Sequence, residues 1–297
     1  MTVPDAFILG FTKCATTSLY NQLMQHPDVS KTKHKEPHFH FSQVLGRSFD
    51  GVADNDTVAQ MFITDKNKYE SLYTSSKLSI DGSAMSIEHP EVVKRIHTQY
   101  PNAKHIVMLR DPIDRAFSAY SHLVRDARET RSFREALEQE LAGERNAFLP
   151  IWHNMQSSRF VEATQFARSL LGDKLMVINY QDYAKNNVQV MNKVAAFLGL
   201  TSAAWTQDFA NRSGVPHSKA LQKVLMRKSV AKTIFVNVFP ERFVSSLKRK
   251  LVERNTGEKP HLSPQDRAYF SQLLLDEKDK ILPNTPDTQL LNSLYQL

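Results

Sequence analysis

Short apolar runs alternate along the chain with longer stretches in which apolar residues recur at helical spacing. The short runs predict buried strands, and the helical spacing predicts amphipathic helices. Their alternation indicates an α/β fold with a central, mostly parallel sheet and helices on both faces. The expected strands are residues 4–10, 78–83, 104–110 and 174–180, and the expected helices are residues 16–26, 58–73, 90–100, 111–128, 132–141, 154–171 and 188–198.

The remainder of the pattern indicates one domain. Residues 31–41 are polar, charged and interrupted by Pro37, so we expect a loop or a short edge segment there. From about residue 205 the pattern is helical, and no repeat, low-complexity tract or linker divides the chain. With 297 residues the chain can bury a substantial core, and we expect residues 1–297 to form a single domain.

Composition narrows the classes of function. No apolar run approaches the length of a membrane span, and the N-terminus lacks the pattern of a signal peptide, so we expect a cytoplasmic protein. The single cysteine, Cys14, excludes an internal disulfide, in agreement with a reducing compartment. The net charge of +7 favours solubility or a positive field around an anionic ligand. Nucleic acid is not an expected partner, because the sequence has no zinc-ligand spacing and no RNA-recognition signature.

Residues 7–20 carry the clearest chemical signal. An apolar run is followed by a polar turn that holds Lys13, Thr16 and Thr17, and then by apolar residues at helical spacing. The first turn of a helix offers free N–H donors and the positive end of the helix dipole to an anionic oxygen. Lys13 adds a positive charge, and the two threonines add hydroxyl donors. This stretch therefore predicts a phosphate-binding turn.

A loop for nucleoside triphosphates is the main rival interpretation. That motif needs a glycine, four residues and then Gly-Lys-Ser/Thr. Counted from Gly10, the glycine and lysine positions hold Ala15 and Thr16, and Lys13 comes earlier in the loop. The spacing argues against a nucleotide-dependent kinase, which stays an alternative together with a non-catalytic nucleotide-binding module. An ordinary strand-to-helix turn can also carry these residue types.

Residues 10–20, Gly-Phe-Thr-Lys-Cys-Ala-Thr-Thr-Ser-Leu-Tyr, resemble the 5′-phosphosulfate loop of sulfotransferases that use 3′-phosphoadenosine 5′-phosphosulfate (PAPS). The chain departs from the family pattern at Thr12, where the family has proline, and at Cys14 and Ala15, where it has a small, glycine-rich pair. The resemblance implies a P-loop-like three-layer fold, PAPS as donor and adenosine 3′,5′-bisphosphate as product. The residues that it assigns to the donor are Thr12, Lys13, Cys14, Ala15, Thr16, Thr17 and Ser18.

A second stretch, residues 110–120, begins with Arg-Asp-Pro and places Ser118 eight residues after Arg110. Arg110 is expected at the end of a strand, where open α/β sheets bind ligands. The planar fork of an arginine can hold two phosphate oxygens. The stretch resembles the 3′-phosphate-binding motif of the same family, which implies that Arg110 and Ser118 bind the 3′-phosphate of PAPS. Taken alone, it is equally typical of an arginine at a strand end followed by a small helix-packing serine.

Residues 35–41, Lys-Glu-Pro-His-Phe-His-Phe, are similar to a segment of the heparan-sulfate-type and related bacterial sulfotransferases in which the glutamate is the general base. The resemblance implies that Glu36 takes the proton of an acceptor hydroxyl, while Lys13 neutralises the leaving phosphate oxygen. His38 and His40 are competing bases, because cytosolic relatives use a histidine. The scheme requires no metal, and the expected acceptor is a carbohydrate or a small hydroxylated molecule.

Two further stretches extend the resemblance. Residues 80–85 resemble a segment near the acceptor of heparan-type enzymes, but Gly82 stands where those enzymes have a catalytic lysine, which argues against a heparan-like acceptor. Residues 211–219 resemble a bacterial segment whose basic residues close over the 3′-phosphate, and they add Arg212 and Lys219 to the expected donor site.

Cys14 supports a separate prediction. A thiol at a helix N-terminus beside Lys13 is expected to have a lowered pKa. A small alkylating agent would then inhibit the enzyme, and bound nucleotide would protect it. A small buried residue is the alternative interpretation of this cysteine.

Overall fold

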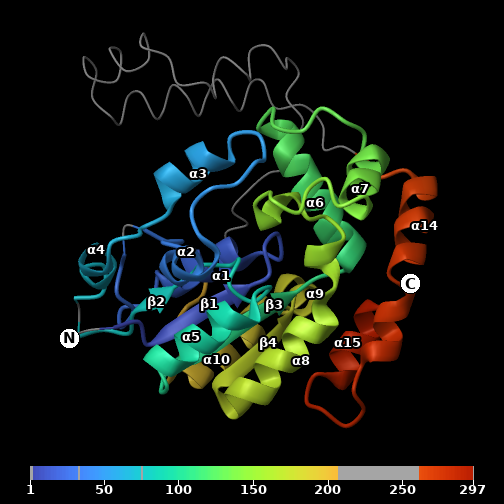
Figure 1. The fold of residues 1–297 in the computed structure, drawn as a ribbon. Coiled ribbons are helices and arrows are strands. Elements are labelled where there is room, and N and C mark those ends of the chain that lie inside the picture. Colours follow the sequence, from blue (N-terminus) through green and yellow to red (C-terminus); the bar gives the residue numbers. More distant parts are fainter. Residues whose placement is uncertain (1–2, 33, 75, 207–260, 297) are drawn as a thin grey trace.

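The computed structural model of the chain describes residues 3–32, 34–74, 76–206 and 261–296. At its centre lies a four-stranded parallel sheet with the strand order β2-β1-β3-β4, and helices cover both of its sides (Figure 1). The strands are β1 (Ala6–Gly10), β2 (Ile80–Asp81), β3 (Lys104–Leu109) and β4 (Leu175–Asn179). The α-helices are α1 (Thr16–Leu23), α2 (Phe39–Leu45), α3 (Asp54–Met61), α4 (Lys66–Glu70), α5 (Pro90–Gln99), α6 (Pro112–Arg125), α7 (Phe133–Leu141), α8 (Phe160–Leu171), α9 (Tyr180–Lys185), α10 (Asn187–Leu198), α14 (Pro264–Leu273) and α15 (Thr288–Leu294).

The two central strands, β1 and β3, bring the candidate motifs together. Every residue of β1 is buried, as is β3 from His105 onward, which is typical of parallel strands covered on both faces. The register pairs Gly10 of β1 with Val107 of β3. The segments that follow these strands therefore leave the same edge of the sheet side by side. Ligands of open α/β sheets bind at this carboxyl edge.

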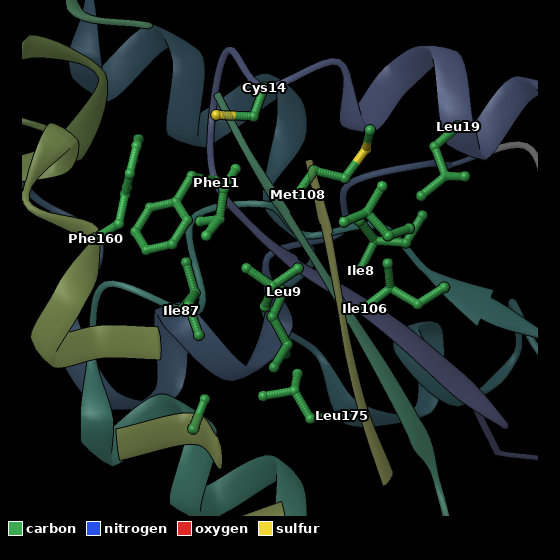
Figure 2. Close-up of a cluster of buried hydrophobic side chains, with 14 of the residues drawn as sticks. Ile8, Leu9, Phe11, Cys14, Leu19, Ile87, Ile106, Met108, Phe160 and Leu175 are labelled. Carbon is green, nitrogen blue, oxygen red and sulfur yellow. The ribbon is translucent and has the colours of Figure 1, made fainter. Parts of the chain in front are cut away.

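The hydrophobic core lies on and between the central strands. Ile8 and Leu9 of β1, Ile106 of β3 and Leu175 of β4 gather there with side chains from the surrounding helices (Figure 2). Helix α8 packs on β3 and β4, and α1 packs on β1. The expected α/β fold with a parallel sheet is confirmed.

The segment expected as a loop through residue 41 differs from the prediction. Its last residues form α2, which begins at Phe39 after His38 in the left-handed conformation. The helix forms because Phe39 and Phe41 are both buried, and Phe39 stacks on Tyr69 with ring centroids 4.4 Å apart. The single helix expected over residues 58–73 is likewise wrong, since α3 and α4 lie there as two short helices.

The C-terminal helices dock on the core through polar contacts. Arg159, just before α8, donates to the Oδ atoms of Asp276 at 2.8 Å and to Oε1 of Glu277 at 2.9 Å. The hydroxyl of Tyr295, just after α15, donates to the carbonyl of Ser158 at 2.6 Å.

Within the described ranges, the helices are too short or too polar to cross a membrane.

Candidate active site

The loop between β1 and α1 forms the expected turn without glycine. Lys13 and Ala15 both take the left-handed conformation, with φ of 67°. Residues other than glycine adopt this conformation at a cost of about 1–2 kcal/mol, and strained residues of this kind cluster at ligand sites. Ala15 is the N-cap of α1 and makes no side-chain capping bond, and the first turn of this helix has no acidic residue. The helix therefore presents uncapped N–H groups and its positive end to an anion.

Lys13 lies in this loop as a poorly solvated cation. Burial, together with the positive charges of Arg125 and Arg115, lowers the pKa of Lys13 to about 8. The threonines that follow it differ in exposure: Thr16 is buried, and Thr17 is half-buried. A bound anion beside Lys13 would favour the charged form of its side chain.

Thr12 and Cys14 hold the loop to the protein interior. The carbonyl and hydroxyl oxygens of Thr12 accept hydrogen bonds from Arg115 at 3.1 and 2.7 Å. Cys14 is fully buried and lies in the core near Phe11 and Met108 (Figure 2). Burial raises the pKa of the Cys14 thiol to about 12. The lowered pKa expected from the sequence is therefore wrong, and Cys14 is a small buried residue.

Arg110 follows β3 directly and reaches the same loop. Its Nη1 donates to the carbonyl of Lys13 at 3.4 Å, and its guanidinium lies over the ring of Tyr180, 4.9 Å from the centroid. Its Nε is buried and has no protein partner among the described residues. An anionic oxygen would supply this missing partner. Ser118 lies two turns into α6 and is half-buried, and its contact with a phosphate stays a prediction.

Glu36 lies near the first turn of α1, to which Lys35 connects it, and its role as base stays a prediction. Its Oε1 pairs with Nζ of Lys35, and its Oε2 lies 3.4 Å from Nε2 of His38. Burial raises the pKa of Glu36, but the charge of Lys35 and the contact with His38 outweigh it and lower the pKa to about 2. The carboxylate is 23% exposed and lines an open hollow of about 360 Å³ with His34, Lys35 and Met61. The hollow therefore opens the Glu36 side chain to solvent.

The two histidines that compete with Glu36 have different positions. His38 is buried beside the carboxylate of Glu36. His40 points into the core, where its Nε2 lies 3.2 Å from the hydroxyl of Tyr69. Burial lowers the pKa of His40 to about 3. Of the two, only His38 contacts the Glu36 carboxylate, at 3.4 Å, so the structure favours it over His40 as an alternative base.

Two expected donor residues, Arg212 and Lys219, lie outside the described residues, and their role stays a prediction. In the parts of the chain that the structure describes, no three His, Cys, Asp or Glu side chains are grouped as metal ligands would be.

Comparison with known proteins identifies the family. A family model described as the sulfotransferase family matches residues 4–206. The chain belongs to the sulfotransferase family. This result confirms the family expected from the loop and from the Arg110 motif, and it disfavours the kinase alternative.

Several known proteins are similar to this sulfotransferase. It is 26% identical to human carbohydrate sulfotransferase 15 over 246 residues, which cover 67% of this chain and 44% of the human protein. A solved sulfotransferase from Alicyclobacillus acidocaldarius is 32% identical with a TM-score of 0.66, over 71% of this chain and 87% of that one. Mouse SULT7A1, solved with PAP, is 17% identical with a TM-score of 0.52 over 98% of this chain and 88% of the mouse chain, which shows the fold alone. The chain spans about half the length of the curated relatives that it matches first.

Sequence reasoning missed a polar cluster at the end of α6 in this sulfotransferase. Nη2 of Arg125 donates to Nδ1 of His122, and Nε2 of His122 lies 3.6 Å from Oδ2 of Asp126. Burial and the charge of Lys13 lower the pKa of His122 well below its usual value. The available signal was spacing, because His122 comes four residues after Ser118 and so lies on the same helix face.

Arg115 is the second residue that sequence reasoning missed. It is fully buried, and besides the two oxygens of Thr12 it donates to the carbonyls of His153 and Asn154 at 3.0 and 3.3 Å. A buried arginine needs such partners, because an uncompensated buried charge is strongly destabilising. Arg115 therefore braces the loop from α6.

Proposed function

We propose that this protein transfers the sulfuryl group of PAPS to a hydroxyl or amine of a carbohydrate or a small hydroxylated metabolite. The observation that carries the proposal is the junction of three groups at one edge of the sheet. Arg110 contacts the backbone of Lys13 in the loop, and Lys35 links Thr17, in the first turn of α1, to Glu36. A phosphate-binding turn, an arginine and a carboxylate are the parts that this reaction needs.

Transfer proceeds by in-line displacement. An acceptor oxygen or nitrogen attacks the sulfur of the donor, and its proton passes to the carboxylate of Glu36. The bond between sulfur and the 5′-phosphate oxygen breaks, and its electron pair stays on that oxygen. The ammonium of Lys13 and the N–H groups of the first turn of α1 stabilise this charge. Adenosine 3′,5′-bisphosphate leaves as the second product.

Arg110 is proposed to bind the 3′-phosphate, with Ser118, Arg212 and Lys219 as further contacts. Its guanidinium is held between the loop and the ring of Tyr180. Its buried Nε has no partner among the described residues and can donate to a ligand oxygen. Charge-assisted hydrogen bonds to phosphate are among the strongest in proteins.

The acceptor proposal rests on the hollow beside Glu36 and on relatives such as carbohydrate sulfotransferase 15. A hollow of about 360 Å³ that is open to solvent suits one sugar unit of a longer chain or a small free molecule. Gly82 stands where heparan-type enzymes have a catalytic lysine, and this difference sets the site apart from those enzymes.

The donor proposal is tested by calorimetric titration of the protein with adenosine 3′,5′-bisphosphate and, separately, with ATP and magnesium. We expect tight binding of the bisphosphate without metal, and a loss of at least tenfold in Arg110→Ala, because one charge-assisted contact contributes about 1.5–3 kcal/mol. Arg47→Ala, at an exposed position, is the matched control. A preference for magnesium ATP, or equal affinity in Arg110→Ala, would contradict the donor assignment.

The role of Glu36 is tested by Glu36→Gln, which keeps the shape of the side chain but cannot accept the proton. Removal of a general base typically slows a reaction about 10²–10⁴-fold. We expect sulfuryl transfer from labelled PAPS to a panel of glycosides and desulfated polysaccharides to fall by at least 10²-fold. Binding of adenosine 3′,5′-bisphosphate should stay within about threefold of wild type. Unchanged transfer by Glu36→Gln would move the base to His38.

A further inference from the structure

The side chain of Lys35 connects the loop to the candidate base. Its Nζ donates to Oγ1 of Thr17 at 2.9 Å and also pairs with Oε1 of Glu36. The side chain is 17% exposed, so water screens these contacts only partly. One ammonium group thus links α1 to the segment that leads into α2.

Gly82 makes room for this arrangement. Its N–H donates to the carbonyl of Lys35 at 2.9 Å. A Cβ at position 82 would lie 3.0 Å from that carbonyl oxygen, 3.1 Å from Cγ of Lys35 and 3.2 Å from a ring carbon of Tyr20. The stem of Lys35 therefore passes over the space that a side chain at position 82 would need.

We propose that Lys35 is a positioning residue that holds the carboxylate of Glu36 next to the donor loop. Its ammonium also takes the place of the lysine that heparan-type enzymes have at the position of Gly82. The inference rests on the proposed function, because it gives Glu36 the role of base. It assigns a task to the lysine of the Lys-Glu pair, for which the sequence alone indicates no role.

The geometry explains why the base needs this lysine. The Glu36 carboxylate has a close contact with Nζ of Lys35 and a longer one, 3.4 Å, with Nε2 of His38. Without the ammonium of Lys35, the carboxylate can rotate away from the acceptor, and misplacement by about 1 Å costs about 10² in rate. When Glu36 takes the acceptor proton, its charge is lost, and Nζ keeps Thr17 as its partner beside the leaving group.

The charge of Lys35 also favours the ionised form of Glu36 and lowers its pKa. The other titratable groups that act on Glu36 are His38 on the same segment, Lys13 on the loop and His122 on α6. Burial alone would raise the pKa of Glu36, and Lys35 is the largest opposing influence. Removal of Lys35 should therefore raise the pKa of Glu36 and move its titration toward neutral pH.

The test compares Lys35→Met and Lys35→Arg with wild type, and uses Lys31→Met, an exposed position four residues earlier, as the control. The titration of Glu36 is followed by NMR in protein with labelled glutamate, and its signal is assigned by its absence from Glu36→Gln. We expect the pKa of Glu36 to rise by about one to two units in Lys35→Met, and to stay near its wild-type value in Lys35→Arg and Lys31→Met.

Kinetics provide the second readout, with PAPS as donor and, as acceptor, the member of the panel of glycosides and desulfated polysaccharides that wild type turns over fastest. We expect kcat to fall at least tenfold in Lys35→Met with partial recovery in Lys35→Arg, while the Kd for adenosine 3′,5′-bisphosphate changes less than about threefold. An unchanged Glu36 titration, or a kcat equal to wild type, would overturn the inference. If wild type fails to bind the bisphosphate, the proposed function fails by itself, and the NMR titration still decides whether Lys35 holds Glu36.

Discussion

At the scale of single residues, Lys13 is the cation whose charge state should be visible in solution. Burial lowers its pKa to about 8, so the side chain of the free protein is charged below that pH and neutral above it. A neutral lysine attracts a phosphate group less strongly, and the affinity for adenosine 3′,5′-bisphosphate should therefore fall as pH rises through about 8. We expect a loss of roughly 10- to 30-fold between pH 7 and pH 9.5, measured by calorimetry, and the larger value applies if only the charged form of Lys13 binds.

Two variants separate Lys13 from the other groups that titrate in this range. Lys13→Met should bind weakly at every pH, because it has no charge to lose. Lys13→Arg should bind with little pH dependence, because a guanidinium keeps its charge up to very high pH. A pH profile of Lys13→Met that still falls through pH 8 would assign the titration to another residue.

At the scale of elements, α6 should control both the stability of the protein and the shape of the donor loop. Arg115 donates from this helix to Thr12 in the loop and to the carbonyls of His153 and Asn154. Arg115→Met leaves these oxygens without their donor, and we expect it to lower the free energy of unfolding in urea by about 3 kcal/mol, because each unsatisfied buried acceptor costs about 1–3 kcal/mol. Arg134→Met is the matched control. The side chain of Arg134 is 38% exposed and pairs with Asp266, so its loss should lower the free energy of unfolding by less than about 1 kcal/mol.

A milder variant covers the case in which Arg115→Met does not fold. Thr12→Val removes one of the hydrogen bonds and keeps the arginine. It should lower the free energy of unfolding by about 1 kcal/mol and weaken binding of adenosine 3′,5′-bisphosphate, because the loop loses one anchor. Full stability and full affinity in Thr12→Val would show that Arg115 does not brace the loop.

The elements also show what the sequence could and could not predict. The strands were predictable because short apolar runs bounded by polar residues are typical of strands that a parallel sheet buries on both faces. The two phosphate motifs were predictable because they directly follow β1 and β3. Helix α2 could not be predicted, because it depends on the stacking of Phe39 on Tyr69, and these residues are thirty positions apart in the sequence. The inward direction of His40 depends on the same packing. Periodicity along the chain does not contain such contacts.

At the scale of the whole molecule, Cys14 should report the opening of the core. Its thiol is fully buried, and burial raises its pKa to about 12, so the native state holds almost no reactive thiolate. It lies with side chains of β1 and β3 in the core drawn in Figure 2, so a reagent reaches it only when these strands separate from their helices. Alkylation by iodoacetamide, followed by mass spectrometry, should therefore be slow in native buffer and should accelerate with urea in parallel with unfolding.

The donor product provides the control for this prediction. A ligand that binds only the folded state stabilises it by about 2.7 kcal/mol at one hundred times its Kd, which corresponds to roughly 100-fold slower alkylation if modification requires global opening. Local opening of the loop would instead give alkylation that depends little on urea, and a thiol activated by Lys13 would react within minutes in native buffer. The urea dependence and the effect of adenosine 3′,5′-bisphosphate together distinguish these three behaviours. We expect the rate of alkylation to depend strongly on urea and on the bisphosphate, because Cys14 belongs to the donor loop in the sequence but is buried in the core in the structure.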